Sequence, residues 1–593
     1  MTGTDIHGDT HWPLRVWTLA VLGGLIALAI ERLGAMPQPD GVWARSLEAA
    51  SIFLGVSGLA FGLTWVRGRL GGAIVIALLC GLIAGGVLLW NLTPKRYATD
   101  EGWRLACGFA AASFLLILHQ AGQHRATGRP ARWTPAGLLA WKRESIRYAD
   151  VHGHLWTNAI MIGAGLLFAL IAFGLAHLLA EMFALVKLGF LRRLLRENWF
   201  DAAICGTALG IALGLLRDRG TIIAALQRVV MVILRVLAPV LAIGIFIFLA
   251  ALPLTGLAPL WETRGTTPIM LGGAIIALIL CNAVVDDSEA DESRSVPLSA
   301  CAAALGLFLV PMVGIAAFSS WLRVAQHGLS PERLWALAFI AVGGIVALAY
   351  VVTILGRRGW FARLRRTNLR LVFLLAGIAL ILSTPLVGFE RIATAHQLHR
   401  LATHQVSVED FDYRALWFDF GPSRKAATRE LSHAADPGIR RYARAVQRLA
   451  SPYDPPPNAR GGEQGAPLDS RLTILPRPVP IENALRTRLL AYDACGTEGR
   501  CLLRHVPGES VAILISYPVP SCEDCRPIVR LLERGAGDWK ASAEILAQGD
   551  AALAAEAAVR AGDVSFREVA RRQLYLGNEA VGEPIPPENS AAP

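Results

Sequence analysis

Four cysteines near the end of the chain are the residues best suited to chemistry by their type and spacing. They are Cys495, Cys501, Cys522 and Cys525, and the last two form the pair in "CEDC". An even set of cysteines in an exported domain indicates disulfides, and the local pairs 495–501 and 522–525 are one of three connectivities. Zinc binding, free thiols and a redox pair stay open as alternatives, although the acidic Glu523 and Asp524 disfavour a thiolate.

Three ionisable residues lie in or near long apolar segments, where such residues are candidates for function. His177 and Glu181 are four residues apart and would share one helix face, and Arg235 stands four residues before Pro239. In a transporter these side chains would surround a central cavity beside broken helices. The alternative is that they reach the membrane interface along their apolar stems.

The remaining motifs give no catalytic set. His396 and His399 would share a helix face, but His404 falls off that face and no carboxylate completes the group. The chain carries no Walker loop, no Gly-x-Ser-x-Gly, no His-Glu-x-x-His and no Gly-x-Gly-x-x-Gly after a strand. The sequence therefore predicts no catalytic residue, no cofactor and no bound metal, and favours a protein that is not an enzyme.

The amino-acid composition indicates that membrane-spanning segments position many of these residues. The 593 residues are 54% hydrophobic and 17% charged, whereas soluble chains are about a quarter charged. The formal net charge is +11, but from Phe389 onward the chain has 25 basic and 26 acidic residues. The basic excess thus lies among the apolar segments, where it orients a membrane protein, and a nucleic-acid partner is not expected.

Eleven apolar runs approach the ~20 residues that a helix needs to cross a bilayer. They are 14–30, 47–66, 70–90, 103–121, 156–180, 200–216, 229–252, 268–285, 297–318, 332–355 and 370–388. Because lipid offers no partner for unpaired backbone groups, these runs are helices. The fold class is an all-α polytopic membrane bundle of about 11 transmembrane helices, with a smaller C-terminal α+β extramembrane domain.

Glycines recur at a spacing of four in three of these runs, which is typical of tight helix packing. The positions are Gly58 and Gly62, Gly81 and Gly85, and Gly206, Gly210 and Gly214.

Basic loops predict the orientation of the bundle. The arginine-rich stretches 122–150 and 356–370 should face the cytoplasm, which places the C-terminal domain on the outer side of an inner membrane. The basic stretch 187–200 would then lie outside, and its pattern predicts an amphipathic helix in the interface. An error of one span would reverse the side of the C-terminal domain.

Changes in composition divide the chain into five parts. We expect a transmembrane domain over 1–388, a juxtamembrane helical segment over 389–450 and a Pro/Gly-rich linker over 451–480. A small α+β domain then covers 481–580, with strands at 511–517 and on both sides of "GAGD", and helix over 549–576. The tail, 581–593, is expected to be disordered.

The stretch "FDYRALWFDFG", residues 411–421, places five aromatic rings just after the last span. Tyr413, Leu416, Trp417 and Phe420 fit one face of a two-turn helix, with Asp412 as its N-cap and Gly421 at its end. A strand is the competing interpretation. In either form the rings would dock this segment onto its neighbours or onto the membrane interface, and a ligand-stacking platform is the functional alternative.

This stretch, placed after many spans, resembles a bacterial integral-membrane family known only as domain of unknown function 4153. The residues that carry the resemblance are Phe411, Asp412, Tyr413, Leu416, Phe418, Asp419 and Gly421. The resemblance covers about residues 150–450. It implies a multi-pass membrane protein and no assigned activity, so no catalytic residue follows from it.

Together these patterns favour a non-enzymatic membrane protein with an envelope-associated, regulatory or interaction role. The expected partners are the lipid bilayer, which surrounds the spans, and a protein that could bind to the C-terminal domain. A small-molecule or lipid transporter is the alternative, and an outer-side thiol oxidoreductase using Cys522 and Cys525 is the second.

Overall fold

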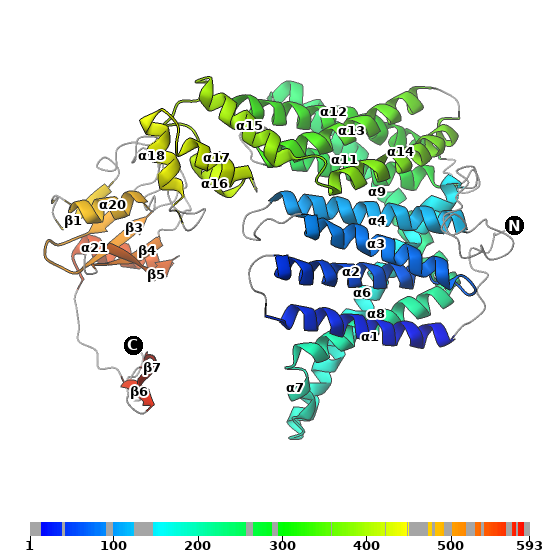
Figure 1. The fold of residues 1–593 in the computed structure, drawn as a ribbon, viewed down its shortest axis with the longest axis horizontal. Helices are drawn as coiled ribbons and strands as arrows, with labels where there is room; N and C mark the ends of the chain where they lie inside the picture. The colour runs from blue at the N-terminus through cyan, green and yellow to red at the C-terminus, as the bar shows by residue number, and fades with distance from the viewer. Residues whose placement is uncertain are drawn as a thin grey trace. The chain divides into compact units, whose positions relative to one another are not determined.

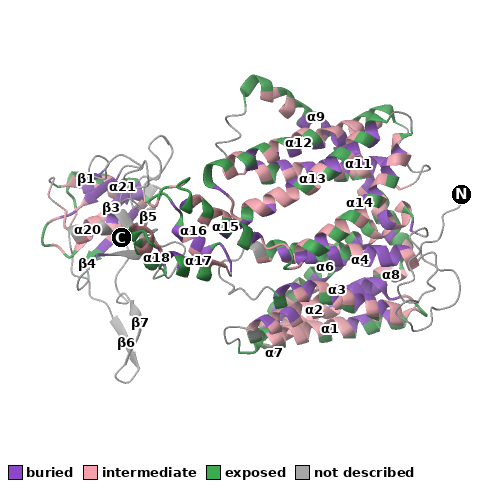
Figure 2. Ribbon diagram, turned by 45° about the horizontal axis from the view of Figure 1, so that its top comes forward, coloured by how far each residue is buried: buried purple, intermediate pink, exposed green. Residues whose placement is uncertain are grey.

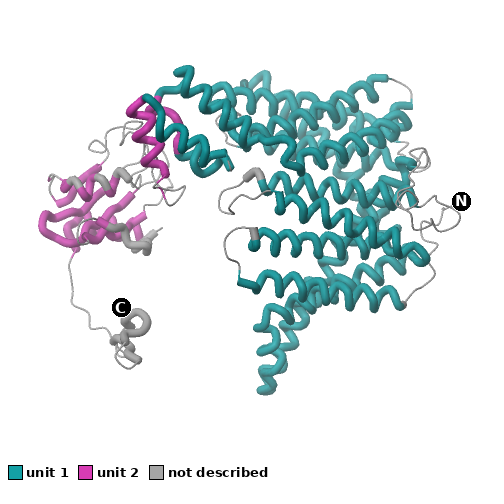
Figure 3. Tube along the Cα trace, in the orientation of Figure 1, with its two compact units in different colours: residues 1–407, 414–435 teal, residues 408–413, 436–593 magenta. Residues whose placement is uncertain are grey.

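The structure is a computed structural model of the whole chain. It describes residues 13–37, 42–90, 99–123, 146–256, 265–287, 295–356, 359–421, 423–447, 449, 472–476, 479, 481–491, 501–516, 528–534, 539–548, 550–564, 572–576 and 579–585. The chain divides into two compact units (Figure 3). Unit 1 is Met1–Ser407 with Arg414–Ala435, and unit 2 is Val408–Tyr413 with Asp436–Pro593.

Eleven helices among the described residues are long and apolar enough to cross a membrane, as the sequence predicts (Figure 1). They are α1 (Pro13–Ala35), α2 (Val42–Thr64), α3 (Leu70–Trp90), α4 (Thr99–Gln123), α6 (Tyr148–Leu185), α8 (Asn198–Asp218), α9 (Gly220–Thr255), α11 (Thr266–Val285), α12 (Val296–His327), α13 (Pro331–Leu355) and α14 (Trp360–Ser383). The predicted polytopic bundle is therefore confirmed.

The exposed surface of this bundle is apolar. Large hydrophobic side chains stand open along α9, including Val236, Val240 and Phe246, each at least 60% exposed. Buried residues lie between neighbouring helices, and half-buried and exposed residues cover the outward faces (Figure 2). Water would solvate such faces poorly, so acyl chains are the solvent that fits them.

The last span differs most from its prediction. It was expected at 370–388, whereas α14 begins at Trp360 and ends at Ser383. Arginine is a good helix former, so the arginine-rich stretch forms the first turns of the helix instead of a loop. Thr384 precedes Pro385 and adopts an extended backbone with ψ 163°, which ends the helix early.

Glycines bring helix backbones together at two of the three predicted seams, whereas a Cβ on Gly58 or Gly62 would meet only side-chain atoms. A Cβ built on Gly206, Gly210 or Gly214 of α8 would lie under 3.0 Å from backbone atoms of α1, and one on Gly81 or Gly85 of α3 would meet backbone oxygens of α2. Only glycine permits such contact, so these positions fix the pairs α1–α8 and α2–α3.

The amphipathic interface helix predicted at 187–200 is shorter in the structure. Lys187 has φ 64°, which interrupts the helical path after α6, and α8 already starts at Asn198. Between them α7 (Phe190–Leu194) has five residues, and the Phe190 ring stacks on Phe183 at 5.8 Å.

Four short helices follow the last span. They are α15 (Phe389–Ala402), α16 (Tyr413–Phe418), α17 (Ser423–Leu431) and α18 (Pro437–Val446). The break before α18 occurs at "DPG", where the Asp436 carboxylate accepts hydrogen bonds from the amides of Gly438 and Ile439.

The C-terminal residues form a five-stranded sheet in the order β1-β2-β3-β4-β5. The strands are β1 (Leu472–Leu475), β2 (Cys501–Arg504), β3 (Val511–Ser516), β4 (Ile528–Arg534) and β5 (Trp539–Gln548). Helix α20 (Asn483–Ala491) connects the parallel pair β1–β2, and the other neighbours are antiparallel. The strands expected at 511–517 and around "GAGD" are present.

Each face of this sheet has its own hydrophobic core. Leu485 and Leu489 of α20 pack on one face with Leu503 and Leu514. Ala552 and Val559 of α21 (Asp550–Ala561) pack on the other face with Leu502, Ile515 and Val529. Successive side chains of each strand thus point alternately into the two cores. The α+β domain is a sheet with one helix on each face.

Two predicted boundaries need correction. The linker 451–480 contains β1, because the short apolar run "LTIL" between prolines pairs with β2. The expected helix over 549–576 ends at Ala561, and β6 (Arg572–Leu576) pairs antiparallel with β7 (Glu579–Ile585). The predicted tail therefore begins inside a strand, and residues 586–593 lie outside the described residues.

Candidate functional site

A group of buried and half-buried polar side chains lies where α11 ends in unit 1. We call it the α11-end cluster and define it as Tyr148 and His152 of α6, Arg235 of α9, Asn282, Asp286 and Asp287 at the end of α11, Tyr350 of α13, and Arg365 and Asn368 of α14. Five spans, from distant parts of the sequence, supply these side chains.

Asparagine and tyrosine side chains form the buried half of the cluster. The Asn282 amide donates to the Tyr350 hydroxyl at 2.7 Å, and that hydroxyl donates to the Asn368 carbonyl at 2.9 Å. The Asn368 amide returns a hydrogen bond to the Asn282 carbonyl at 2.6 Å. A closed network of this kind holds α11, α13 and α14 in one register, since each buried polar group depends on the others.

Two arginines close the end of α11. The Arg365 guanidinium donates to the carbonyls of Val285 and Asp286 at 3.1 and 3.2 Å. Arg235 donates to the Ala283 carbonyl at 3.0 Å and forms an ion pair with the Asp286 carboxylate. Positive charge at a helix C-terminus compensates the carbonyls that have no partner within the helix.

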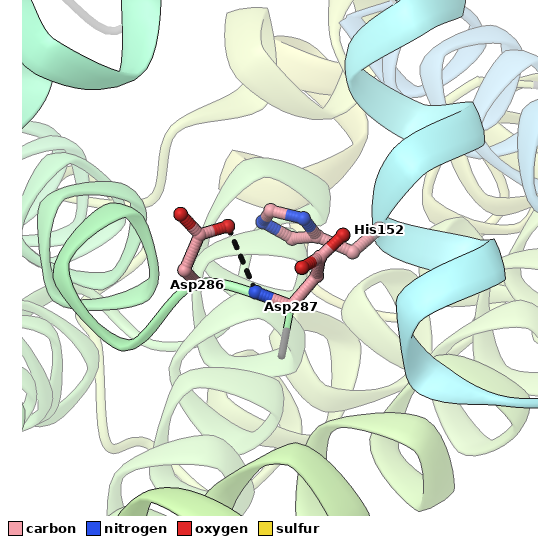
Figure 4. A group of neighbouring side chains, drawn as sticks. All are labelled: His152, Asp286 and Asp287. Atoms are coloured by element: carbon pink, nitrogen blue, oxygen red, sulfur yellow. Dashed lines mark hydrogen bonds between the residues drawn. The ribbon is translucent and has the colours of Figure 1, made fainter. Parts of the chain in front are cut away.

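Asp286 takes an unusual backbone conformation just after the helix. Its φ is 54°, in the left-handed region that costs a non-glycine residue free energy, and its carboxylate accepts from the Asp287 amide at 2.8 Å. This turn directs the side chains of Asp286 and Asp287 toward α6, where His152 lies (Figure 4).

His152 is 4% exposed and completes a group of three metal-ligating side chains. One ligand atom from each of His152, Asp286 and Asp287 lies within 4.8 Å of the other two. Trp156 donates to His152 Nε2 at 3.2 Å, whereas His152 Nδ1 is buried and has no hydrogen-bond partner among the described residues. An imidazole with two carboxylates is a donor set that divalent transition metals accept.

The sequence prediction of no metal ligands did not anticipate this group. His152 lies in "HGH" and the aspartates open the acidic run "DDSEADES", so each motif is visible in the sequence. More than a hundred positions separate them, and only the packing of α6 against the end of α11 brings them together.

The three predicted intramembrane residues separate into two groups. Arg235 joins the α11-end cluster through Asp286. The side chains of His177 and Glu181 are 44% and 64% exposed, and their nearest charged neighbours are Asp201 at 3.9 Å and Arg192 at 3.4 Å. These two side chains thus lie on the exposed surface of unit 1, and their place in a transport path stays a prediction.

Within the aromatic stretch 411–421, residues Tyr413–Phe418 form the short helix α16, as favoured, but the helix ends before Phe420 and Gly421. All rings of the stretch except Trp417 are buried. Phe411, Tyr413, Leu416, Phe418 and Phe420 are each at most 4% exposed. Such burial fits a packing role and leaves little room for a ligand-stacking platform.

Within unit 2, Tyr413 sits between two other rings, with centroids 4.8 Å from Phe411 and 5.5 Å from Tyr442. Burial, reinforced by the nearby Asp436, raises the pKa of the Tyr413 hydroxyl above its usual range. The hydroxyl therefore stays neutral.

Within unit 1, Gly421 ends the stretch with φ 57°, and a Cβ there would lie 2.8 Å from the Glu390 carboxylate. The Arg424 guanidinium covers the Trp417 ring at 5.5 Å and donates to the Trp417 carbonyl. The predicted N-cap role of Asp412 stays a prediction.

Of the four C-terminal cysteines, one lies in the described residues. Cys501, at the start of β2, is 3% exposed and disulfide-bonded. Cys495, Cys522 and Cys525 lie outside the described residues, so the pairing and the redox alternative stay predictions. The cysteines of the spans, Cys80, Cys107, Cys205, Cys281 and Cys301, are free thiols.

Comparison with known proteins gives one match. A family model described as "Domain of unknown function (DUF4153)" matches residues 49–419. No curated protein and no solved structure matches the chain. The matched range holds ten of the eleven spans and the α11-end cluster, and it ends inside the aromatic stretch.

Proposed function

Since the chain belongs to the DUF4153 family of unknown function, as the sequence resemblance implied, we propose that it is a non-enzymatic membrane protein that binds a protein partner through its C-terminal domain. In this proposal the bundle lies in a bacterial inner membrane and the domain faces the envelope. The basic stretches 122–150 and 356–370 support that orientation.

One observation carries the proposal: the sheet has a hydrophobic core on each face. Among the side chains of unit 2 whose exposure the structure describes, Leu553 is the single large hydrophobic one that stands exposed, at 48%. A domain with a polar surface needs no further covering to be stable, and such surfaces serve in reversible protein contacts. The disulfide at Cys501 fits an oxidising compartment.

The proposal predicts that partner binding requires the folded sheet. Leu503 is fully buried in β2, and replacing it with alanine should destabilise the domain by about 2 kcal/mol. The same change at exposed Leu553 should have little effect. After cross-linking in native membranes, the purified full chain should carry a partner protein in the wild type and in Leu553→Ala, and clearly less of it in Leu503→Ala.

Two results would contradict the proposal. One is a wild-type protein that purifies as a single species with no cross-linked partner. The other is equal recovery of the partner with Leu503→Ala after a melting experiment has shown that the C-terminal domain of this variant is unfolded at the temperature of cross-linking.

A further inference from the structure

We propose that His152, Asp286 and Asp287 bind one divalent transition-metal cation at the end of α11 (Figure 4). All three residues belong to unit 1, and the site is separate from the C-terminal domain on which the proposed partner binding depends.

The distances among the three donor atoms leave space for a cation between them. The three ligand atoms lie within 4.8 Å of one another. Metal–nitrogen and metal–oxygen bonds are about 2.0–2.2 Å long, so ligands of one ion stand about 3–3.5 Å apart. The two aspartates follow the last residue of α11 and could close this gap by moving about 1 Å.

The histidine supplies an independent indication of a ligand. His152 is 96% removed from solvent, yet its Nδ1 has no hydrogen-bond partner among the described residues. A buried nitrogen without a partner is costly, and a bond from Nδ1 to a metal cation would satisfy it. Binding at Nδ1 places the ring hydrogen on Nε2, so the metal must displace the hydrogen bond from Trp156.

The donor types select the class of metal. Calcium and magnesium prefer oxygen ligands alone, whereas zinc, manganese, cobalt and iron accept imidazole together with carboxylates. Three protein ligands leave further positions for water, as in open metal sites.

The neighbouring charges show what the cation must overcome. Arg235 forms an ion pair with Asp286, and Arg365 lies against the carbonyls at the end of α11. The dipole of α11 offsets part of the Arg365 charge, whereas Arg235 competes directly with a metal for the same carboxylate. Removing the Arg235 charge should therefore strengthen metal binding.

The test uses the purified full chain in detergent and cobalt(II) as the probe, with zinc(II) as competitor. The wild type should bind one cobalt ion per chain with visible d–d absorption that zinc removes. His152→Gln and Asp287→Asn should each weaken binding by roughly 100-fold or more, beyond the effect of losing an outer-shell partner. His154→Gln, the same change two residues along α6, should bind as the wild type does.

A fold control separates ligand loss from unfolding. Thermal unfolding without metal should be similar in His152→Gln and His154→Gln, and Arg235→Gln should bind cobalt several-fold more tightly than the wild type. The proposal is overturned if the wild type takes up no stoichiometric cobalt. In that case a water molecule, and not a metal, would lie between His152 and the aspartates. Equal binding by folded His152→Gln and wild type would overturn it too.

Discussion

Replacing Gly210 with alanine is expected to lower the free energy of unfolding of the bundle by about 3 kcal/mol. A Cβ at this position of α8 would lie under 3.0 Å from the carbonyl of Leu19 and from the Cα of Ala20 in α1. Backbone cannot rotate away as a flexible side chain can, so the two helices must separate. The pair also carries a buried ion pair between Arg15 and Asp218, which would shift with them.

The control for this prediction is Gly244→Ala in α9, where a Cβ would meet nothing within 4 Å. Alanine favours helix over glycine by up to about 1 kcal/mol, so this variant should be as stable as the wild type or slightly more stable. Unfolding in mixed micelles, followed by tryptophan fluorescence, measures both. Equal stability of the two variants would show that α1 and α8 do not pack through Gly210.

Replacing Arg104 with methionine is expected to cost about 4 kcal/mol, because it leaves two backbone carbonyls without their donor. Arg104 of α4 is 2% exposed and donates to the carbonyls of Thr384 and Val387, just after α14, at 2.5 and 2.8 Å. It also lies 5.9 Å from the Trp335 ring, which contacts Phe389 of α15. Loss of the Arg104 side chain should make the connection between α14 and α15, residues 384–388, more mobile.

The matched control is Arg32→Met on α1, whose side chain is 67% exposed. A surface change of this kind should stay within about 0.5 kcal/mol of the wild type. Limited proteolysis near residues 384–388 should be faster in Arg104→Met and unchanged in Arg32→Met. Unchanged stability and proteolysis in both variants would show that Arg104 does not hold the segment after α14 in place.

The spans could be predicted from the sequence because crossing a bilayer requires a long apolar helix, a property that each segment carries alone. The residues at which the helices begin and end could be predicted less well. Hydropathy detects the apolar part of α6 at 156–180, but the helix continues through polar residues from Tyr148 to Leu185. The glycine seams were also predictable, since small residues four apart have few other uses in a span.

The α11-end cluster could not be predicted, because it depends on which spans become neighbours. Neither His152 nor Asp286 belongs to a local metal-binding motif, and the position of Arg235 in an apolar run does not reveal its partner. The strand β1 was hidden in the proline-rich region for a similar reason, since four residues form a strand only when β2 lies beside them.

Eleven helices are long and apolar enough to cross a membrane. The central proposal is that all eleven cross it, which would carry the C-terminal domain to the side opposite the N-terminus. Reporter fusions at both ends of the full chain test it most directly. Alkaline phosphatase, active only outside the cytoplasm, should be active at the C-terminus, and green fluorescent protein should fluoresce at the N-terminus. If both ends report the same side, the number of crossings is even, and the eleven-span account is wrong.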